Sequence, residues 1–220
     1  MEWMLDSANL NEVRESLEIF PICGVTTNPT ILRAEGRIDY AKHLRELRAI
    51  VGSNRTFHVQ AGVDGCDNIV REAQRIHEIL GKDVYIKVPI TEEGLKAIAR
   101  LKAQGVHITA TAIYTAYQGL LAADAGADYL APYCNRMEQF GIDFGAAITQ
   151  IRHMIDHDHL PAKILGASYK NVGQLVRSVD CGAHAITAQP AMLRAALKSA
   201  LVVDAVRTFN DNQAWIDGKD

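Results

Sequence analysis

The stretch Val84-Tyr85-Ile86-Lys87-Val88-Pro89-Ile90 places one lysine inside a run of β-branched and aromatic residues. This composition is typical of a strand that is buried on both faces, as in a parallel sheet. Burying an unpaired ammonium ion is unfavourable, so such a lysine tends to lose its proton and become a nucleophile that forms Schiff bases with carbonyl groups. The alternative is that Lys87 ends a strand with its charge in water or beside a carboxylate. The stretch alone leaves both interpretations open.

Short β-prone runs alternate with longer amphipathic segments along the whole chain. Strands are predicted at 3–5, 24–26, 56–60, 84–87, 106–109, 129–131, 162–166 and 183–187. Helices are predicted at 9–19, 41–51, 68–80, 92–103, 116–125, 144–155, 172–179 and 192–197. Eight successive strand–helix units predict an α/β fold, a (β/α)8 TIM barrel. An open doubly wound sheet is the alternative, but its GxGxxG fingerprint is absent from the sequence.

No linker or low-complexity segment interrupts the pattern, so we expect a single barrel domain over residues 1–220. A further helical stretch, at about 201–217, follows the eighth unit and carries Leu201, Val202, Ala205, Phe209 and Trp215. A helix with an apolar stripe must bury that stripe somewhere. We therefore expect an extra C-terminal helix that packs on its own barrel or on another subunit.

The composition excludes several classes of function. The chain of 220 residues is 48% hydrophobic and 22% charged, with a formal net charge of −3 and no basic run, so nucleic-acid binding is not expected. No apolar run reaches the length of a membrane span. The four cysteines are scattered without a CxxC spacing, which predicts free thiols and no metal site. The N-terminus does not resemble a signal peptide, so a cytoplasmic location is expected.

In a (β/α)8 barrel, catalytic groups lie at the C-terminal ends of the strands. The polar residues near the predicted ends are Asp6, Thr26, Thr27, Asn28, Gln60, Lys87, Thr109, Thr111, Tyr133, Ser168 and Thr187. Such a set suits proton transfer and the binding of sugar hydroxyls. Strand ends are polar in many proteins, so the set supports an active site without identifying it.

Specific motifs run through nearly the whole chain. They are Leu5-Asp6, Gly24-Val25-Thr26-Thr27-Asn28-Pro29-Thr30, Ile86-Lys87-Val88-Pro89-Ile90-Thr91, Thr111-Ala112-Ile113-Tyr114, Ala131-Pro132-Tyr133-Cys134-Asn135-Arg136 and Gly166-Ala167-Ser168-Tyr169-Lys170. In this order and at these distances they resemble the fructose-6-phosphate aldolase branch of the transaldolase family. The resemblance implies a class I aldolase barrel with a Schiff-base lysine and no metal or organic cofactor.

The resemblance also implies roles for the residues around the lysine. Lys87 would form the iminium with the donor ketone, and Asp6 and Asn28 match positions that hold the donor hydroxyls. Thr27, in the same motif as Asn28, joins the expected substrate-binding set. The alternatives are that Asp6 caps a helix and that Asn28, which precedes a proline, only forms a turn.

Gln60, Thr111 and Tyr133 match the trio that positions a catalytic water in the aldolase branch, with Tyr133 as the acid/base. Transaldolases that resemble this chain usually carry a glutamate in place of Gln60 and a phenylalanine in place of Tyr133. The alternative for Tyr133 is an amphipathic residue at the barrel rim. Both positions favour an aldolase, which releases the bound three-carbon unit instead of transferring it.

Phosphate recognition is expected from Arg136, Ser168 and Lys170, because guanidinium, hydroxyl and ammonium groups bind phosphate oxygens. A surface role for Arg136 or Lys170 is the alternative. Ala188 and Gln189 depart from the Thr-Leu-Pro pattern that is common in the family, which affects the rim of the substrate pocket.

Three functions follow as hypotheses. The first is an aldolase that makes or cleaves a ketose phosphate such as fructose 6-phosphate, from dihydroxyacetone and glyceraldehyde 3-phosphate, and the resemblance implies a homodecamer with the C-terminal helix on a neighbour. The second is a transaldolase that transfers the dihydroxyacetone unit between sugar phosphates. The third is a non-catalytic ring protein that binds sugar phosphates.

Overall fold

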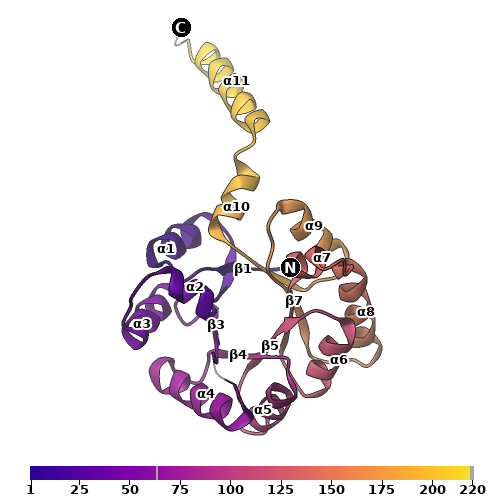
Figure 1. The fold of residues 1–220 in the computed structure, drawn as a ribbon. Coiled ribbons are helices and arrows are strands. Elements are labelled where there is room, and N and C mark those ends of the chain that lie inside the picture. The colour runs from indigo at the N-terminus through magenta and orange to yellow at the C-terminus, as the bar shows by residue number, and fades with distance from the viewer. Residues whose placement is uncertain (63, 219–220) are drawn as a thin grey trace.

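The computed structural model describes residues 1–62 and 64–218, and its strands close into a barrel (Figure 1). The strands are β1 (Glu2–Asp6), β2 (Ile22–Thr26), β3 (Thr56–Gln60), β4 (Tyr85–Pro89), β5 (Ile108–Ile113), β6 (Tyr129–Pro132), β7 (Lys163–Gly166) and β8 (Ala185–Ala188). Each strand pairs in parallel with the next, and β8 pairs with β1 to close the ring. The predicted (β/α)8 barrel is therefore confirmed.

The helices surround the barrel, as Figure 1 shows. They are α1 (Leu10–Ile19), α2 (Pro29–Ala34), α3 (Tyr40–Val51), α4 (Cys66–Leu80), α5 (Glu92–Lys102), α6 (Ala116–Asp124), α7 (Cys134–Gln139), α8 (Phe144–His157), α9 (Val172–Asp180), α10 (Pro190–Leu197) and α11 (Ala200–Ile216). Helices α2 and α7 were not predicted, because six residues are too few to show a helical period. Strands β5 and β8 begin two residues later than predicted.

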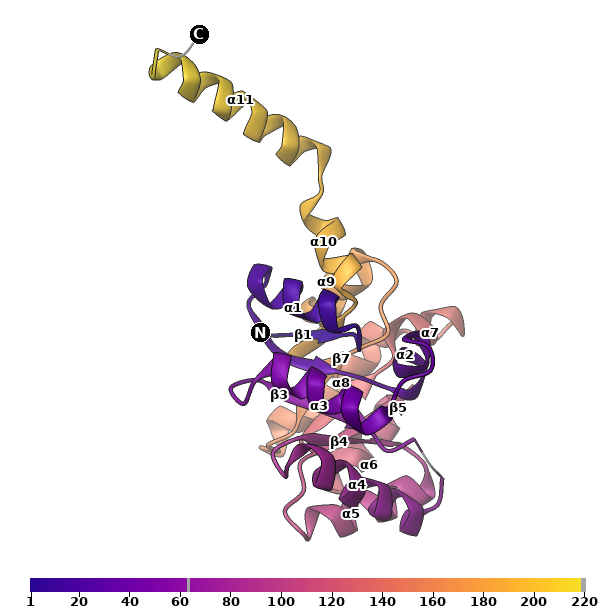
Figure 2. The ribbon, with the colours of Figure 1, turned by 90° about the vertical axis from the view of Figure 1, so that its left-hand side faces the viewer.

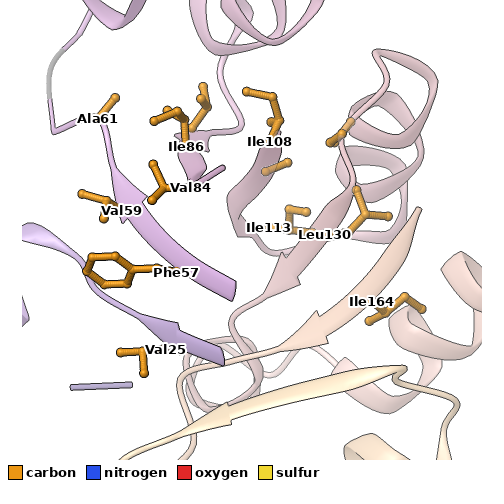
Figure 3. Close-up of a cluster of buried hydrophobic side chains, with 14 of the residues drawn as sticks. Val25, Phe57, Val59, Ala61, Val84, Ile86, Ile108, Ile113, Leu130 and Ile164 are labelled. Atoms are coloured by element: carbon orange, nitrogen blue, oxygen red, sulfur yellow. The ribbon is translucent and has the colours of Figure 1, made fainter. Parts of the chain in front are cut away.

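Alternation along the strands separates the core from the barrel interior. Phe57 and Val59 of β3 point outward and join a hydrophobic cluster with helix residues such as Leu44 and Leu47 of α3. Figure 3 shows part of this cluster between strands and helices. The intervening His58 of β3 consequently faces the inside of the barrel, and the same alternation turns Lys87 of β4 inward.

Side chains fill the half of the barrel interior that lies toward the N-terminal ends of the strands. Met4, Tyr129 and Leu165 form a small apolar cluster there. His58 is fully buried, stacks on Tyr85 with ring centroids 4.6 Å apart, and its two nitrogens contact the hydroxyls of Thr109 at 2.8 Å and Thr56 at 3.0 Å. Glu2 accepts a hydrogen bond from Tyr129 and pairs with Lys163 at the N-terminal end. These side chains keep solvent away from Lys87 on the N-terminal side of the barrel.

A sharp turn follows the lysine strand. The Thr91 hydroxyl caps α5 by accepting a hydrogen bond from the Gly94 amide at 2.9 Å. A Cβ atom at Gly94 would lie 1.9 Å from the Pro89 carbonyl oxygen, so only glycine fits there. The motif around Lys87 thus fixes where β4 ends and α5 begins.

The C-terminal helix does not cover its own barrel. Helix α10 contacts α1 and α9, whereas α11 projects away from the ring, as Figures 1 and 2 show. None of the described residues of α11 is buried, and Leu201, Phe209 and Trp215 are 82%, 67% and 74% exposed. Of the two placements predicted for this helix, packing on its own barrel is not the one observed.

Burial inside the barrel lowers the pKa of His58 to about 3, so the folded protein holds this ring neutral. The unfolded chain takes up a proton at His58 below about pH 6.5, so the free energy of unfolding should fall with pH by up to about 1.4 kcal/mol per unit in that range. His58→Leu removes this proton uptake. The slope of the free energy of unfolding against pH should therefore decrease by up to about 1.4 kcal/mol per unit between about pH 6 and pH 4. Denaturant titrations at a series of pH values, at one protein concentration, measure the slope.

The same substitution should lower stability at neutral pH by roughly 1–3 kcal/mol, because it leaves the hydroxyls of Thr56 and Thr109 without their imidazole partner. Replacing the exposed His153 by glutamine serves as the control and should change stability by no more than about 0.5 kcal/mol. An unchanged pH slope in His58→Leu would contradict the assignment of a neutral buried histidine.

Candidate active site

A cavity of about 400 Å³ opens at the C-terminal ends of the strands. This is the size of a pocket for a small metabolite, and the end of the barrel where such sites lie. Eight of the ten predicted site residues line it: Asp6, Asn28, Gln60, Lys87, Tyr133, Arg136, Ser168 and Lys170. The other two, Thr27 and Thr111, are fully buried behind this lining and contact members of it.

Lys87 stands on β4 at the base of the cavity and is 5% exposed. Its ammonium nitrogen donates a hydrogen bond of 2.9 Å to the carbonyl oxygen of Thr27. Burial lowers the pKa of Lys87, and the negative charge of Asp6 opposes this shift. A lysine with one neutral hydrogen-bond acceptor and little water loses its proton more easily than a surface lysine. Its free amine can therefore act as a nucleophile toward a carbonyl group.

Asp6 ends β1 inside the barrel and is held by a hydroxyl. Thr26 of β2 donates a hydrogen bond of 2.7 Å to one Asp6 carboxylate oxygen, and its own oxygen lies 2.7 Å from the hydroxyl of Thr187 on β8. Burial raises the pKa of Asp6, while Lys87 and the Thr26 hydroxyl oppose the rise. The cap of α1 is Asn9, so Asp6 is not the helix cap that was the alternative interpretation.

Thr111 and Tyr133 form a second hydroxyl pair, on β5 and just after β6. The Thr111 hydroxyl donates a hydrogen bond of 3.0 Å to the Tyr133 oxygen. Because the Thr111 proton occupies this bond, the phenol proton of Tyr133 stays available for the cavity. Burial raises the pKa of Tyr133 and the Thr111 hydroxyl opposes the rise, so the protonated phenol is favoured over the phenolate.

The backbone is irregular beside this pair. Ala112 has a φ of 59°, and the pairing of β5 with β6 shifts its register between Ala110 and Ile113. Left-handed backbone at a residue other than glycine is unfavourable and concentrates near functional sites, as do bulges. Ser168, after β7, shows the same feature with a φ of 61°. Ser168 lines the cavity, and Ala112 directly follows Thr111 on β5.

Asn28 and Thr27 act through different groups. The Asn28 side-chain oxygen caps α2 by accepting a hydrogen bond from the Ile31 amide at 3.0 Å, so its local role is that of a helix cap and not only of a turn residue. The amide nitrogen of the same side chain is left to donate into the cavity. The Thr27 hydroxyl donates to the His58 carbonyl at 3.3 Å, so Thr27 meets the site through its own carbonyl oxygen, which accepts from Lys87.

Gln60 lies beside the lysine in the sheet. Its Cα is the register partner of Lys87 across β3 and β4, so both side chains point inward at the same height. No other described side chain forms a hydrogen bond with the Gln60 amide, which leaves that amide free for a water or a ligand. The position fits the water-holding role implied by the resemblance.

Positive groups gather on the β6–β7 side of the cavity. Arg136 lies over the Tyr133 ring, with its guanidinium carbon 5.8 Å from the ring centroid, and neither it nor Lys170 forms an ion pair with a described residue. Ser168 lines the same cavity. Unpaired cations and a hydroxyl at the rim suit a phosphate group. The rim residues Ala188 and Gln189 also border the cavity, as the sequence indicated.

Two residues near the cavity, Thr26 and Thr187, were not among the ten predicted site residues. Thr26 and Thr187 appear among the polar strand ends but only the closed barrel brings them together, because they lie 161 residues apart in sequence.

Among the described residues no group of three His, Cys, Asp or Glu side chains could hold a metal ion. Within the described part of the chain, no helix has both the length and the apolar character needed to cross a membrane.

Comparisons with known proteins identify the family of the chain. Residues 3–217 match the family described as Transaldolase/Fructose-6-phosphate aldolase. The chain is 46% identical over 212 residues to a "Probable fructose-6-phosphate aldolase" of Streptococcus pneumoniae (strain ATCC 700669 / Spain 23F-1), with 96% of each chain covered. It is 38% identical over 189 residues to a "Probable transaldolase 2" of Listeria monocytogenes serovar 1/2a, with 85% of this chain and 84% of that protein covered.

A likeness in three dimensions supports the fold alone. A designed protein described as a cube-shaped, highly porous cage made by fusing symmetric oligomeric domains aligns with a TM-score of 0.59 at 13% identity. The alignment covers 99% of this chain and 75% of that one. The sequence comparisons are stronger, and they place this chain in the transaldolase/fructose-6-phosphate aldolase family of enzymes.

Proposed function

We propose that the protein is a class I aldolase that makes or cleaves a ketose phosphate through a Schiff base on Lys87. The observation that carries this proposal is the buried Lys87 amine, whose one hydrogen-bond partner among the described residues is the Thr27 carbonyl, in the same cavity as Tyr133 with its Thr111 partner. An amine nucleophile and a proton donor in one pocket are the two groups that such a reaction needs. Fructose 6-phosphate, cleaved to dihydroxyacetone and glyceraldehyde 3-phosphate, is the substrate we propose.

The chemistry balances with these groups alone. The Lys87 amine adds to the ketone carbonyl, and water leaves as the iminium forms. The bond between the α and β carbons of the iminium breaks, and its electron pair moves into an enamine. The hydroxyl on the β carbon loses its proton as that carbon becomes the aldehyde. That proton returns to the enamine carbon by way of Tyr133 and a water held by Gln60 and Thr111. Hydrolysis of the iminium then consumes one water and frees dihydroxyacetone.

The two sides of the cavity support one orientation of the substrate. The Asp6 carboxylate on β1 accepts hydroxyl protons and repels anions, so it suits the unphosphorylated donor ketone. Arg136, Ser168 and Lys170 lie on the β6–β7 side and suit the phosphate of the acceptor aldehyde. This polarity supports a free ketone as donor and an aldehyde phosphate as acceptor.

Transaldolase activity is the second candidate, because this chain also aligns with relatives named as probable transaldolases. The alignments cover 84% to 95% of the length of those relatives. Tyr133 favours the aldolase, since its free phenol proton can quench the enamine and release the donor. The third hypothesis, a non-catalytic binding protein, does not account for a lysine buried without a counter-ion in contact. The four free cysteines suit a reducing compartment, and we propose the cytoplasm.

We predict that Lys87→Met abolishes aldolase activity while the fold is kept, because methionine fills the same space without the amine. Native protein treated with dihydroxyacetone and borohydride should gain the mass of one reduced adduct, and peptide mapping should place it on Lys87. Lys42→Met, at an exposed position of α3, is the matched control and should keep both activity and adduct. Activity in Lys87→Met, or an adduct on another lysine, would refute the assignment.

We predict that Tyr133→Phe lowers aldolase turnover by about 10²- to 10⁴-fold and leaves borohydride trapping nearly unchanged. The substitution removes the proton donor but not the amine. Adding Gln60→Glu should move the balance toward transfer of the three-carbon unit to an aldose phosphate acceptor, because a carboxylate can act as general base. A double variant without any gain in transfer relative to release would show that these two positions do not separate the activities.

We also propose that the protein assembles as a decamer through α11. The helix exposes seven large apolar side chains: Leu201, Val202, Val203, Val206, Phe209, Trp215 and Ile216. Full burial of such a side chain contributes roughly 1.5–3 kcal/mol, so a helix left in water forgoes a large stabilisation. A helix that leaves its own barrel and lies on the next one makes a head-to-tail contact, and repetition of that contact closes a ring.

Light scattering tests the assembly. The full-length protein should have the mass of a decamer, and a chain truncated after Leu201 should form smaller species. Phe209→Asp should weaken the assembly in the same way, whereas Asn210→Asp adds the same charge at the neighbouring exposed position and should not. A full-length monomer, or a truncated protein that keeps its full mass, would contradict the role of α11.

A further inference from the structure

Thr187 lies at the base of the cavity but has no role in the chemistry described above. It belongs to β8, its Cα is the register partner of Met4 on β1, and it is 3% exposed. Asp6 follows Met4 by two residues on the same strand, so Thr187 lies one layer below Asp6 on the inside of the barrel. The side chain still borders the cavity that contains Lys87.

The hydrogen bonds of this region fix where each hydroxyl proton lies. Thr26 has one hydroxyl proton, and that proton bonds to the Asp6 carboxylate at 2.7 Å. The second contact of Thr26, at 2.7 Å to the Thr187 oxygen, must therefore use the proton of Thr187. While Asp6 is ionised, the order of donation is Thr187 to Thr26 to Asp6.

This order leaves Thr187 as an acceptor only. Its proton is engaged with Thr26, while lone pairs of its oxygen remain, and no other described residue donates to them. An oxygen of this kind beside an otherwise formed cavity prefers a ligand that brings its own proton. A hydroxyl meets that requirement, whereas a methyl group does not.

We propose that Thr187 is a specificity-determining residue that accepts a hydrogen bond from a hydroxyl of the donor ketone. This inference rests on the proposed aldolase function. The phosphate end of the substrate is assigned to β6 and β7, and the ketone carbon is bound to Lys87 on β4. The donor carbon that takes no part in the cleaved bond consequently points toward β8, β1 and β2, where Thr187, Asp6 and Thr26 lie. Thr187 thus selects ketones that are hydroxylated on that carbon.

Two donors that differ only there provide the test. Dihydroxyacetone carries a hydroxyl on both carbons beside the carbonyl. Hydroxyacetone lacks one of these hydroxyls, so the carbon concerned is a methyl group. Thr187→Val keeps the shape of the side chain and removes the acceptor oxygen. We expect it to raise the half-saturating concentration of dihydroxyacetone in borohydride trapping roughly fivefold to tenfold, and that of hydroxyacetone by less than about twofold.

Thr187→Ser keeps the oxygen and should behave like the native protein with both donors. Thr187→Ala removes the oxygen without adding bulk, and it replaces the valine variant if circular dichroism shows that the latter is misfolded. Equal changes for the two donors, or no change for either, would overturn the role of Thr187. Native protein that forms no adduct with any ketone would instead overturn the aldolase assignment itself, so the two failures are distinguishable.

Discussion

The rest of the structure depends on one energetically unfavourable feature, the burial of the Lys87 amine inside the barrel. Among the described residues, Lys87 has a single hydrogen-bond partner, the carbonyl of Thr27, and the charge of Asp6 opposes the lowering of its pKa. An ammonium ion is less stable in such a place than in water, so burial lowers the pKa of Lys87 and favours the neutral amine. The neutral, fully buried His58 and the rings stacked below it keep this environment dry from the N-terminal side. Stability and reactivity therefore come from the same packing.

Much of the fold follows from the sequence because a parallel barrel repeats one local pattern. Strand β3 was predicted to the residue at Thr56–Gln60, since its alternation and its flanking loops are both clear. Strand β5 was placed too early, because the left-handed Ala112 interrupts the alternation that would extend it through Ile113. Helix α7 was missed because it is short and follows directly on Tyr133. Local patterns predict local structure, and they fail where the backbone is strained for the site.

The candidate site shows the same division. Lys87, Gln60 and Tyr133 could be found from motifs, because each residue carries its signal in the neighbouring sequence. The Thr26–Thr187 contact could not, because it depends on the register between β1 and β8 where the barrel closes. Nor does a motif reveal that Thr27 acts through its carbonyl and Asn28 partly through a helix cap. These properties belong to the three-dimensional arrangement, and a residue list alone does not contain them.

The two hydroxyl pairs give the cavity a direction. On the β5–β6 side, Thr111 donates to Tyr133 and leaves the phenol with a proton to give. On the β8–β1–β2 side, donation ends on a carboxylate, so Thr187 and Asp6 offer lone pairs and no proton. In the reaction we propose, a ketose bound between these sides meets a proton source near the bond that breaks and acceptors near the hydroxyl that stays. The same residue type, threonine, produces opposite effects because its partner is a phenol in one pair and a carboxylate in the other. In that proposal, the direction of proton donation orients the substrate more than the identity of the hydroxyl groups does.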